Sequence, residues 1–297
     1  MIRKMNIQKW LKRNTKHLSG KTYAVTGSTG GIGKELCRYL AGLGADLILM
    51  DRNIERSKKF GSELEACFSG ICVDYITVDL EDMDSVINGC EILKTMPVDG
   101  IIHNAGAYSI PRHKCGTGLD NVFQINFFAP YYITKELLPV LRTRGGRVIA
   151  VGSVAHNYSE TDPSDTDFST RKKASLVYGN AKRYLMFALH ELFRTETEAH
   201  LAVTHPGITF TNITAHYPKV IFAVIKHPMK IIFMKPRAAC LSILDGVFRD
   251  TPYGSWTGPA LFDVWGNPHT RQLHTCTDEE KHRIFHTAEK LYKEFKG

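Results

Sequence analysis

A glycine-rich segment near the N-terminus places the tightest limit on how this 297-residue chain can fold. The segment reads Thr26-Gly27-Ser28-Thr29-Gly30-Gly31-Ile32-Gly33. An apolar run precedes it, and apolar residues at helical spacing follow it. Glycines at such a strand-to-helix turn allow a tight bend and let the backbone approach a pyrophosphate, which then faces the first N–H groups of the helix. The segment therefore predicts a dinucleotide-binding site.

Apolar runs of strand length alternate with helical patterns along the rest of the chain. We expect strands at residues 22–26, 46–50, 74–78, 100–103, 147–151 and 201–205. We expect helices at residues 119–141, around 178–193 and at 278–295, the last capped by Thr277. Such alternation implies right-handed crossovers and a mainly parallel sheet. We predict a single α/β domain with a doubly wound, Rossmann-type sheet.

The net charge of +8 is concentrated at the N-terminus. Eight lysines and arginines precede Glu35, the first acidic residue, which leaves 30 basic and 30 acidic residues in the rest of the chain. We assign residues 1–19 to a basic arm and residues 20–297 to the domain. The arm can contact an anionic membrane surface, or it can be a solvated extension or a short helix packed on the domain, which we favour. The equal numbers of basic and acidic residues in the rest of the chain argue against a nucleic-acid partner.

The cysteines and the apolar runs indicate a cytoplasmic protein. The seven cysteines lack metal-type spacing, so we expect reduced thiols and no metal site. No apolar region of secretory type follows the N-terminal charges. The longest apolar run, at residues 220–234, is interrupted by Lys226, His227, Pro228 and Lys230, and it is too short to span a bilayer. Peripheral membrane contact through the basic arm stays open, as does the oligomeric state.

Two residues at the end of the second expected strand bear on the choice of cofactor. Asp51 follows Gly33 by 18 residues, where a carboxylate can accept hydrogen bonds from the adenosine ribose and repel a 2′-phosphate. Arg52 follows directly, and a guanidinium there can instead pair with that phosphate. We favour NAD over NADP, because Thr29 adds no positive charge in the loop.

A proton-transfer set lies far downstream of the loop. Tyr178 and Lys182 are one helical turn apart, so their side chains share a face. A nearby ammonium favours the phenolate form of tyrosine and lowers its pKa. Tyr-x-x-x-Lys alone is a common surface pattern, but this one comes after an expected strand that ends at Gly152-Ser153. The position indicates acid–base chemistry.

With these motifs in their order, the chain resembles the short-chain dehydrogenase/reductase family over roughly residues 20–212. The matching motifs are the loop at residues 26–33, Asp79-Leu80, Asn104-Ala105-Gly106, Asn126, Ser153, Tyr178 with Lys182, and Pro206-Gly207 with Thr209 and Thr211. The resemblance implies a nicotinamide-dependent oxidoreductase that interconverts an alcohol and its aldehyde or ketone. A dinucleotide sensor of the same fold is the alternative, and the presence of Ser153, Tyr178 and Lys182 argues against it.

The resemblance also implies roles for individual residues. Tyr178 would be the acid–base residue, Ser153 would hydrogen-bond the reacting oxygen, and Lys182 would lower the tyrosine pKa and hold the nicotinamide ribose. Asn126 would anchor a water chain. Asp79 would contact the adenine, Thr209 and Thr211 the carboxamide and phosphate end, and the remaining motif residues would line the cofactor.

Within the family, the layout is similar to the retinol-dehydrogenase-like branch, which implies a lipophilic substrate. Twenty-five residues separate Ser153 from Tyr178, more than usual, and the insertion at residues 157–173 is polar. An apolar lid is expected at about residues 212–240, and the chain continues through Trp256-Thr257-Gly258-Pro259 and Trp265-Gly266. Many members of this branch favour NADP, which Asp51 disfavours here, and Gly152 replaces a common serine. His103, His156 and His205 are expected to be structural.

Overall fold

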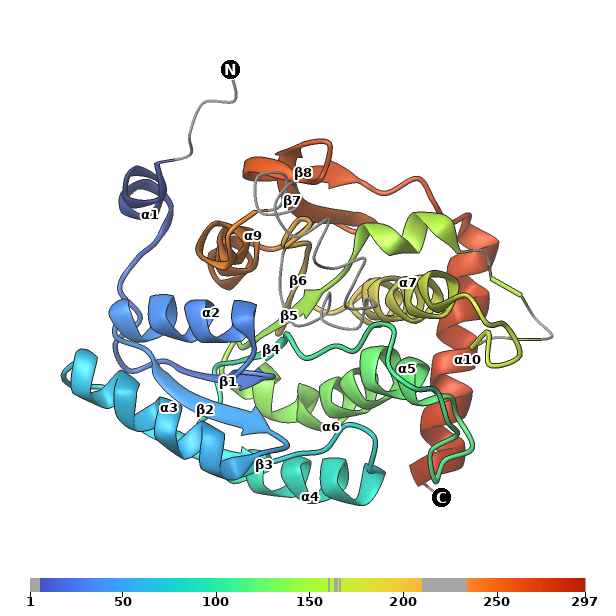
Figure 1. Cartoon of the computed structure of the whole chain (residues 1–297), viewed down its shortest axis with the longest axis horizontal. Helices are drawn as coiled ribbons and strands as arrows, with labels where there is room; N and C mark the ends of the chain where they lie inside the picture. Colours follow the sequence, from blue (N-terminus) through green and yellow to red (C-terminus); the bar gives the residue numbers. More distant parts are fainter. Residues whose placement is uncertain (1–5, 160, 163–164, 166, 210–233, 297) are drawn as a thin grey trace, which may run out of the picture.

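The computed structural model describes residues 6–159, 161–162, 165, 167–209 and 234–296. Among them is one eight-stranded sheet with the strand order β3-β2-β1-β4-β5-β6-β7-β8 (Figure 1). The strands are β1 (Thr22–Thr26), β2 (Asp46–Asp51), β3 (Val73–Thr77), β4 (Gly100–His103), β5 (Arg147–Val151), β6 (His200–Thr204), β7 (Ser255–Leu261) and β8 (Trp265–Gln272). All neighbouring pairs are parallel except the antiparallel pair of β7 and β8. The fold is a single Rossmann-type α/β domain, as predicted.

Helices cover both faces of the sheet (Figure 1). They are α1 (Ile7–Asn14), α2 (Gly31–Gly42), α3 (Ile54–Cys67), α4 (Met83–Lys94), α5 (Asn121–Phe123), α6 (Ala129–Thr143), α7 (Ala174–Leu192), α9 (Pro236–Phe248) and α10 (Asp278–Lys296). One core cluster joins the sheet to α1, α2, α3 and α9, and the other joins it to α4, α6, α7 and α10. Adjacent strand residues serve opposite clusters, because side chains alternate across a strand: Ala24 lies in one and Val25 in the other.

The six strands expected from the sequence are all present. β1, β4 and β5 have the expected bounds, and β2, β3 and β6 differ from them by one residue. The hairpin of β7 and β8 was not predicted. Its outer strand carries Gly266 and Pro268 and is mostly exposed or half-buried, so it has neither the composition nor the alternation of a buried strand.

The basic arm contains a short packed helix, one of the forms considered for it. In α1, Trp10 is buried in a core cluster, while Lys9, Lys12 and Arg13 are exposed. The helix contacts α9. In the part of the chain that the structure describes, no helix combines the length and the apolar character needed to cross a membrane.

The C-terminal region contains the end of the expected lid and the predicted cap of the last helix. The expected lid, residues 212–240, lies mostly outside the described residues, but its last residues belong to α9, where Ala239 and Cys240 are buried. At α10, the Thr277 hydroxyl accepts from the Glu280 N–H at 3.2 Å, and the Glu280 carboxylate accepts from the Thr277 N–H at 3.0 Å. This reciprocal capping box gives Thr277 its predicted role.

The carboxylate of Glu136 ties α10 to α6 and α4. It accepts hydrogen bonds from Lys94, Lys296 and Tyr292, although its side chain is only 6% exposed. Burial alone would raise the pKa of Glu136, but the hydrogen bonds from Lys296, Lys94 and Tyr292 outweigh it and lower that pKa to about 2. The ionised carboxylate therefore stabilises the docking of the C-terminal helix.

We predict that Glu136→Gln lowers the free energy of unfolding by about 1–3 kcal/mol at pH 7, because a buried acceptor of three donors loses its charge. The pKa of Glu136 is lower in the folded state than its usual 4.5, so the stabilisation is complete above about pH 5 and is lost as the pH falls toward 2. Thermal unfolding should therefore separate the variant from the native protein at pH 7 but not near pH 2. Glu91→Gln, which alters an exposed partner of the same Lys94, is the control, and an equal effect of both changes would contradict the prediction.

Candidate active site

A cavity of about 500 Å³ lies at the carboxyl ends of the first four strands. It opens beside the neighbouring strands β1 and β4, where the strand order reverses and α/β sheets bind their ligands. Most of the predicted cofactor residues line it: Gly27, Thr29, Gly30, Gly31, Ile32, Gly33, Asp51, Arg52, Asp79, Leu80, Asn104, Ala105 and Gly106. Asn53, Arg56 and Ile125 also line it and were not predicted. Asn53 and Arg56 follow the end of β2, and Ile125 lies in the helical turn Gln124–Phe128. Their positions after the ends of strands and in this turn are the signal that could have identified them.

Two glycines of the loop, Gly27 and Gly33, are required by backbone conformation or close contacts. Gly27 has a φ of +67°, in the left-handed region that favours glycine. A Cβ on Gly33 would lie 2.2 Å from the carbonyl oxygen of Gly27 and 2.9 Å from the side-chain nitrogen of Asn104. Gly30 is the N-cap of α2, so no side chain at this position covers the first N–H groups of the helix. The first N–H groups of α2 thus belong to residues that line the cavity, where they can bind a pyrophosphate.

Asn104 connects this loop to β4. Its side-chain amide donates to the carbonyl oxygens of Thr26 and Gly27, both at 3.0 Å. The Ala105 N–H donates to the Thr26 hydroxyl at 3.1 Å. Residues after β1 and β4 are therefore held together at the floor of the cavity.

The carboxylate of Asp51 is directed into the loop. It accepts hydrogen bonds from the hydroxyls of Ser28, Ser57 (2.9 Å) and Thr29 (3.1 Å) and from the Thr29 N–H (3.3 Å). Asp51 is only 7% exposed and Ser28 is fully buried. The sequence did not show that these donors already occupy the carboxylate. Ser28, predicted as a cofactor residue, contacts Asp51 and does not line the cavity.

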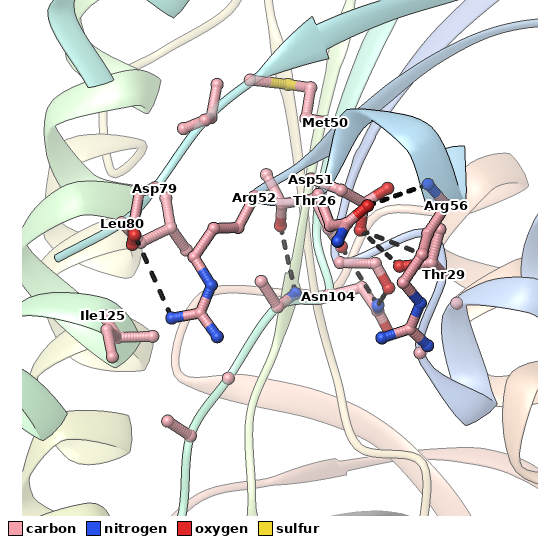
Figure 2. A pocket seen from close by; sticks show the side chains of 18 of the residues that line it. Thr26, Thr29, Met50, Asp51, Arg52, Arg56, Asp79, Leu80, Asn104 and Ile125 are labelled. Atoms are coloured by element: carbon pink, nitrogen blue, oxygen red, sulfur yellow. Dashed lines mark hydrogen bonds and ion pairs between the residues drawn. The ribbon is translucent and has the colours of Figure 1, made fainter. Parts of the chain in front are cut away.

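The two arginines of the cavity lie on opposite sides of it. Figure 2 shows Arg52 directed toward Asp79, with 4.0 Å between its nitrogen and a carboxylate oxygen. Arg56 lies on the other side, near Thr29 (Figure 2). Arg52 is 73% exposed, so its pairing with Asp79 is weak.

Ser153, Tyr178 and Lys182 come together as predicted. The hydroxyls of Ser153 and Tyr178 are hydrogen-bonded, and the Lys182 ammonium lies 5.8 Å from the centroid of the Tyr178 ring. Lys182 is buried and donates to the carbonyl oxygen of Val151 at 2.8 Å. Burial raises the pKa of Tyr178 to about 12, partly offset by the bond to Ser153. Burial also lowers the pKa of Lys182 to about 7.

Asn126 lies in a π-helical turn, Gln124–Phe128, between α5 and α6. Such turns are rare in proteins, and those that do occur often lie at functional sites. The side chain of Asn126 binds both backbone groups of Ala107, accepting at 3.2 Å and donating at 2.8 Å, and it donates to the Val122 carbonyl at 2.8 Å. A Cβ on Gly106 would lie 2.8 Å from the Asn126 oxygen and 3.6 Å from the Lys182 nitrogen. Asn126 therefore adjoins Lys182 across Gly106.

Arg183 supports the 3₁₀ turn (Val154–Tyr158) that follows Ser153. Its guanidinium is buried and donates to the carbonyl oxygens of His156 at 3.2 Å and Ser159 at 2.9 Å. The same group binds the Thr275 carbonyl and the Glu280 carboxylate, the latter at 3.1 Å. The turn after Ser153 is thus linked to the start of α10. Arg183 was not predicted from the sequence, because nothing in the local sequence distinguishes it from any other residue next to Lys182.

The remaining predicted residues follow β6. Pro206 and Gly207 are buried after this strand, and Thr209 forms a bridge with Met234. None of the three lines the cavity as described. Thr211 and most of the expected lid lie outside the described residues.

The three histidines near the motifs are buried, in line with structural roles. Burial lowers the pKa of His103 to about 3 and the pKa values of His156 and His205 to about 4, so all three are neutral at pH 7. His205 stacks on Trp256 with 4.7 Å between ring centroids.

Comparison with known proteins assigns the family. The family described as short chain dehydrogenase matches residues 21–175, more than half of the chain. This chain belongs to the short-chain dehydrogenase family. It is an NAD(P)-dependent oxidoreductase of that family and resembles its retinol-dehydrogenase-like branch.

Individual relatives and a solved structure agree with this assignment. Human polyprenol dehydrogenase is 27% identical, with 86% of this chain and 80% of that protein covered. Mouse retinol dehydrogenase 14 is 28% identical, with 77% and 76% covered. The solved structure of an uncharacterised Mycobacterium paratuberculosis protein is 21% identical, with a TM-score of 0.74 and coverage of 95% of this chain and 96% of that chain. At this identity the last comparison supports the fold alone.

We predict that Gly33→Ala weakens dinucleotide binding by at least about tenfold, because the added Cβ meets the Gly27 backbone and forces the loop to shift, a strain of about 1–3 kcal/mol. Titration of the purified variant with NADH and NADPH, followed by fluorescence, measures the effect. Gly116→Ala is the control, since a Cβ there meets nothing within 4 Å. Unchanged affinity of Gly33→Ala for both dinucleotides would refute the role of this contact.

Proposed function

We propose that this protein interconverts an alcohol and its aldehyde or ketone, with Tyr178 as the acid–base residue. The observation that carries the proposal is the hydrogen-bonded pair of Ser153 and Tyr178 beside the buried ammonium of Lys182. When bound, the nicotinamide accepts or donates the hydride. The cavity suits such a cofactor, because the start of α2 and the contacts of Gly33 leave room for a pyrophosphate against the backbone.

The protein's own part in the reaction is to orient the substrate oxygen and to move one proton. In carbonyl reduction, the neutral Tyr178 phenol donates its proton to that oxygen while the Ser153 hydroxyl binds the same oxygen. With a pKa near 12, Tyr178 is neutral at pH 7 and able to donate its proton. In alcohol oxidation the phenolate is needed, and the protonated Lys182 stabilises it. In this proposal, Asn126 holds the water that returns the proton from solvent, which its position next to Lys182 across Gly106 supports.

We propose NAD(H) as the preferred cofactor. All four donors to Asp51 are neutral, so its carboxylate brings a negative charge to the wall where a 2′-phosphate would lie. Arg52, the residue that favours NADP in the sequence, is directed toward Asp79 instead. The adenosine ribose hydroxyls of NAD(H) must share the Asp51 carboxylate with Thr29, which limits how much their hydrogen bonds add to the binding free energy. Arg52, whose exposed pairing with Asp79 is weak, and Arg56 are the two cations of the described wall, and either can reduce the preference for NAD(H).

We propose a lipophilic substrate. The support is the resemblance to proteins named as polyprenol and retinol dehydrogenases, together with apolar and aromatic side chains beside Tyr178. Tyr108 packs edge-on against the Tyr178 ring, with 5.3 Å between ring centroids, and Ile110 packs against the same apolar cluster as Tyr178. A substrate screen with lipophilic alcohols and carbonyls, each with both cofactors, tests the proposal. Preferential turnover of small hydrophilic polyols would contradict it.

We expect Tyr178→Phe to lower kcat by about 10²–10⁴-fold, because the phenol that transfers the proton is removed while the ring is kept. Dinucleotide affinity should stay within about twofold, since the phenol is not part of the pyrophosphate cradle. Steady-state turnover and dinucleotide titration measure the two effects. Tyr158→Phe, at a tyrosine that is 65% exposed after Ser153, is the matched control. Native turnover by Tyr178→Phe would disprove the assignment.

We expect the native protein to bind NADH about tenfold more tightly than NADPH, a difference of about 1.4 kcal/mol. Asp51→Asn should narrow that ratio by strengthening NADPH binding, because it removes the charge while the amide can still bond to its neighbours. Asp82→Asn, at the exposed N-cap of α4, is the control, since asparagine caps a helix equally well. Equal or tighter binding of NADPH by the native protein would overturn the proposed preference.

A further inference from the structure

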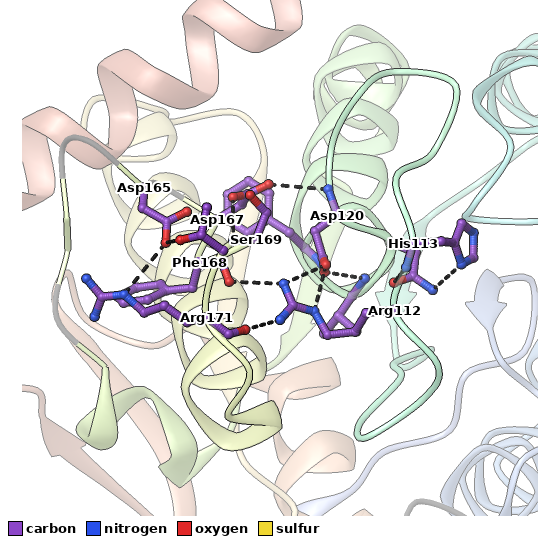
Figure 3. A network of polar contacts seen from close by, with 12 residues as sticks. Arg112, His113, Asp120, Asp165, Asp167, Phe168, Ser169 and Arg171 are labelled. Atoms are coloured by element: carbon purple, nitrogen blue, oxygen red, sulfur yellow. Dashed lines mark hydrogen bonds and ion pairs between the residues drawn. The ribbon is translucent and has the colours of Figure 1, made fainter.

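The polar insertion between Ser153 and Tyr178 has no part in the chemistry derived so far. Its described end, residues 167–171, is docked against the loop that follows β4 and against the start of α5 (Figure 3). One side chain, that of Arg112, makes most of this connection. The insertion therefore has a fixed place beside the catalytic helix α7.

Arg112 joins three chain segments. Its guanidinium binds the carboxylate of Asp120, with nitrogen–oxygen distances of 2.8 and 2.7 Å. It also donates to the carbonyl oxygen of Phe168 at 3.0 Å and to that of Arg171. The side chain of Arg112 is 20% exposed and that of Asp120 is 4% exposed, so solvent screens the pair little. Only a planar guanidinium can reach these acceptors together, which a lysine cannot do.

Asp120 connects this pair to α5, the short helix directly before the π-helical turn that carries Asn126. One of its oxygens binds Arg112, and the other caps α5 by accepting from the N–H groups of Val122 at 3.0 Å and Phe123 at 3.3 Å. Its own N–H donates to the carboxylate of Asp167 in the insertion at 3.3 Å. One carboxylate thus sets both the start of the helix and the position of the insertion.

Phe168 belongs to the apolar cluster against which the acid–base residue Tyr178 packs. Its side chain is 1% exposed and packs in a small cluster with Val122 and Val177, against which Tyr178 also lies. The backbone of Phe168 has a φ of +54°, a left-handed conformation that costs energy in a non-glycine residue. The hydrogen bond from Arg112 to the Phe168 carbonyl holds this conformation, and the Arg171 guanidinium covers the ring at 4.1 Å from its centroid.

We propose that Arg112 is a positioning residue for the reaction, which holds Phe168 of the insertion against α7 so that the Tyr178 ring keeps its orientation toward Ser153. The inference rests on the proposed role of Tyr178. Displacement of a reacting group by about 1 Å can lower the rate about 10²-fold. A residue that does not touch the reacting atoms can therefore govern kcat by holding the residue that does. The cavity that takes the dinucleotide does not include Arg112 or Phe168.

Two variants test the proposal separately. Arg112→Lys keeps the charge and loses the three-way hydrogen bonding, whereas Phe168→Leu keeps the carbonyl that Arg112 binds and loses the ring. We expect each to lower kcat about tenfold or more, to leave NADH affinity within about twofold, and to shift the pH profile of kcat relative to the native enzyme. Arg142→Lys is the matched control, because Arg142, whose side chain is 44% exposed, pairs with Glu196 and joins α6 to the segment after α7, away from Arg112.

The outcomes distinguish this inference from the proposed function. If Tyr178→Phe is inactive but Arg112→Lys and Phe168→Leu both retain the native kcat and pH profile, the positioning role is wrong and the proposed function stands. If both variants lose NADH affinity in proportion to kcat, their effect is general destabilisation, which also overturns the positioning role. If Tyr178→Phe is fully active, the proposed function itself fails. Should Arg112→Lys not fold, Phe168→Leu alone decides.

Discussion

The side-chain amide of Asn104 joins the two strands between which the cavity opens. By donating to the carbonyl oxygens of Thr26 and Gly27, it joins the turn after β1 to the end of β4. The tight packing at Gly33 depends on the same contact, since any larger side chain there would meet both the amide and the loop. β4 also pairs with β5, whose end places Ser153. The dinucleotide loop and the proton-transfer set therefore share one rigid edge of the sheet.

Burial acts in opposite directions on the two ionisable groups of the proton-transfer set. It raises the pKa of Tyr178 and lowers the pKa of Lys182, because each charged form loses solvation. Burial thus favours a neutral tyrosine and brings the pKa of the lysine close to 7. In the proposed reaction, the phenolate needs a nearby positive charge to stabilise it. Part of that charge would have to come from the oxidised nicotinamide. In the proposed mechanism, acid–base activity and cofactor binding would therefore be coupled through this electrostatic balance.

Much of the fold could be predicted from the sequence because strand and helix periodicity is strong in the first two hundred residues. The expected strands were found within one residue, and Ser153, Tyr178 and Lys182 were brought together. The hairpin of β7 and β8 escaped prediction because Gly258, Pro259 and Pro268 obscure the strand pattern. The donors on Asp51 and the bonds of Arg112 and Arg183 also escaped it. Such contacts join residues far apart in the chain, and no local pattern records them.

The link from Arg183 to α10 has a consequence for how the protein is made. The turn after Ser153 is held by Arg183, which is itself held by the carbonyl of Thr275 and the carboxylate of Glu280. These last partners are translated about a hundred residues after Arg183, when the sheet from β1 to β6 is already available to fold. During synthesis, the nascent chain can form its dinucleotide loop early, but the turn beside the proton-transfer set gains its final support only once the C-terminal helix has left the ribosome.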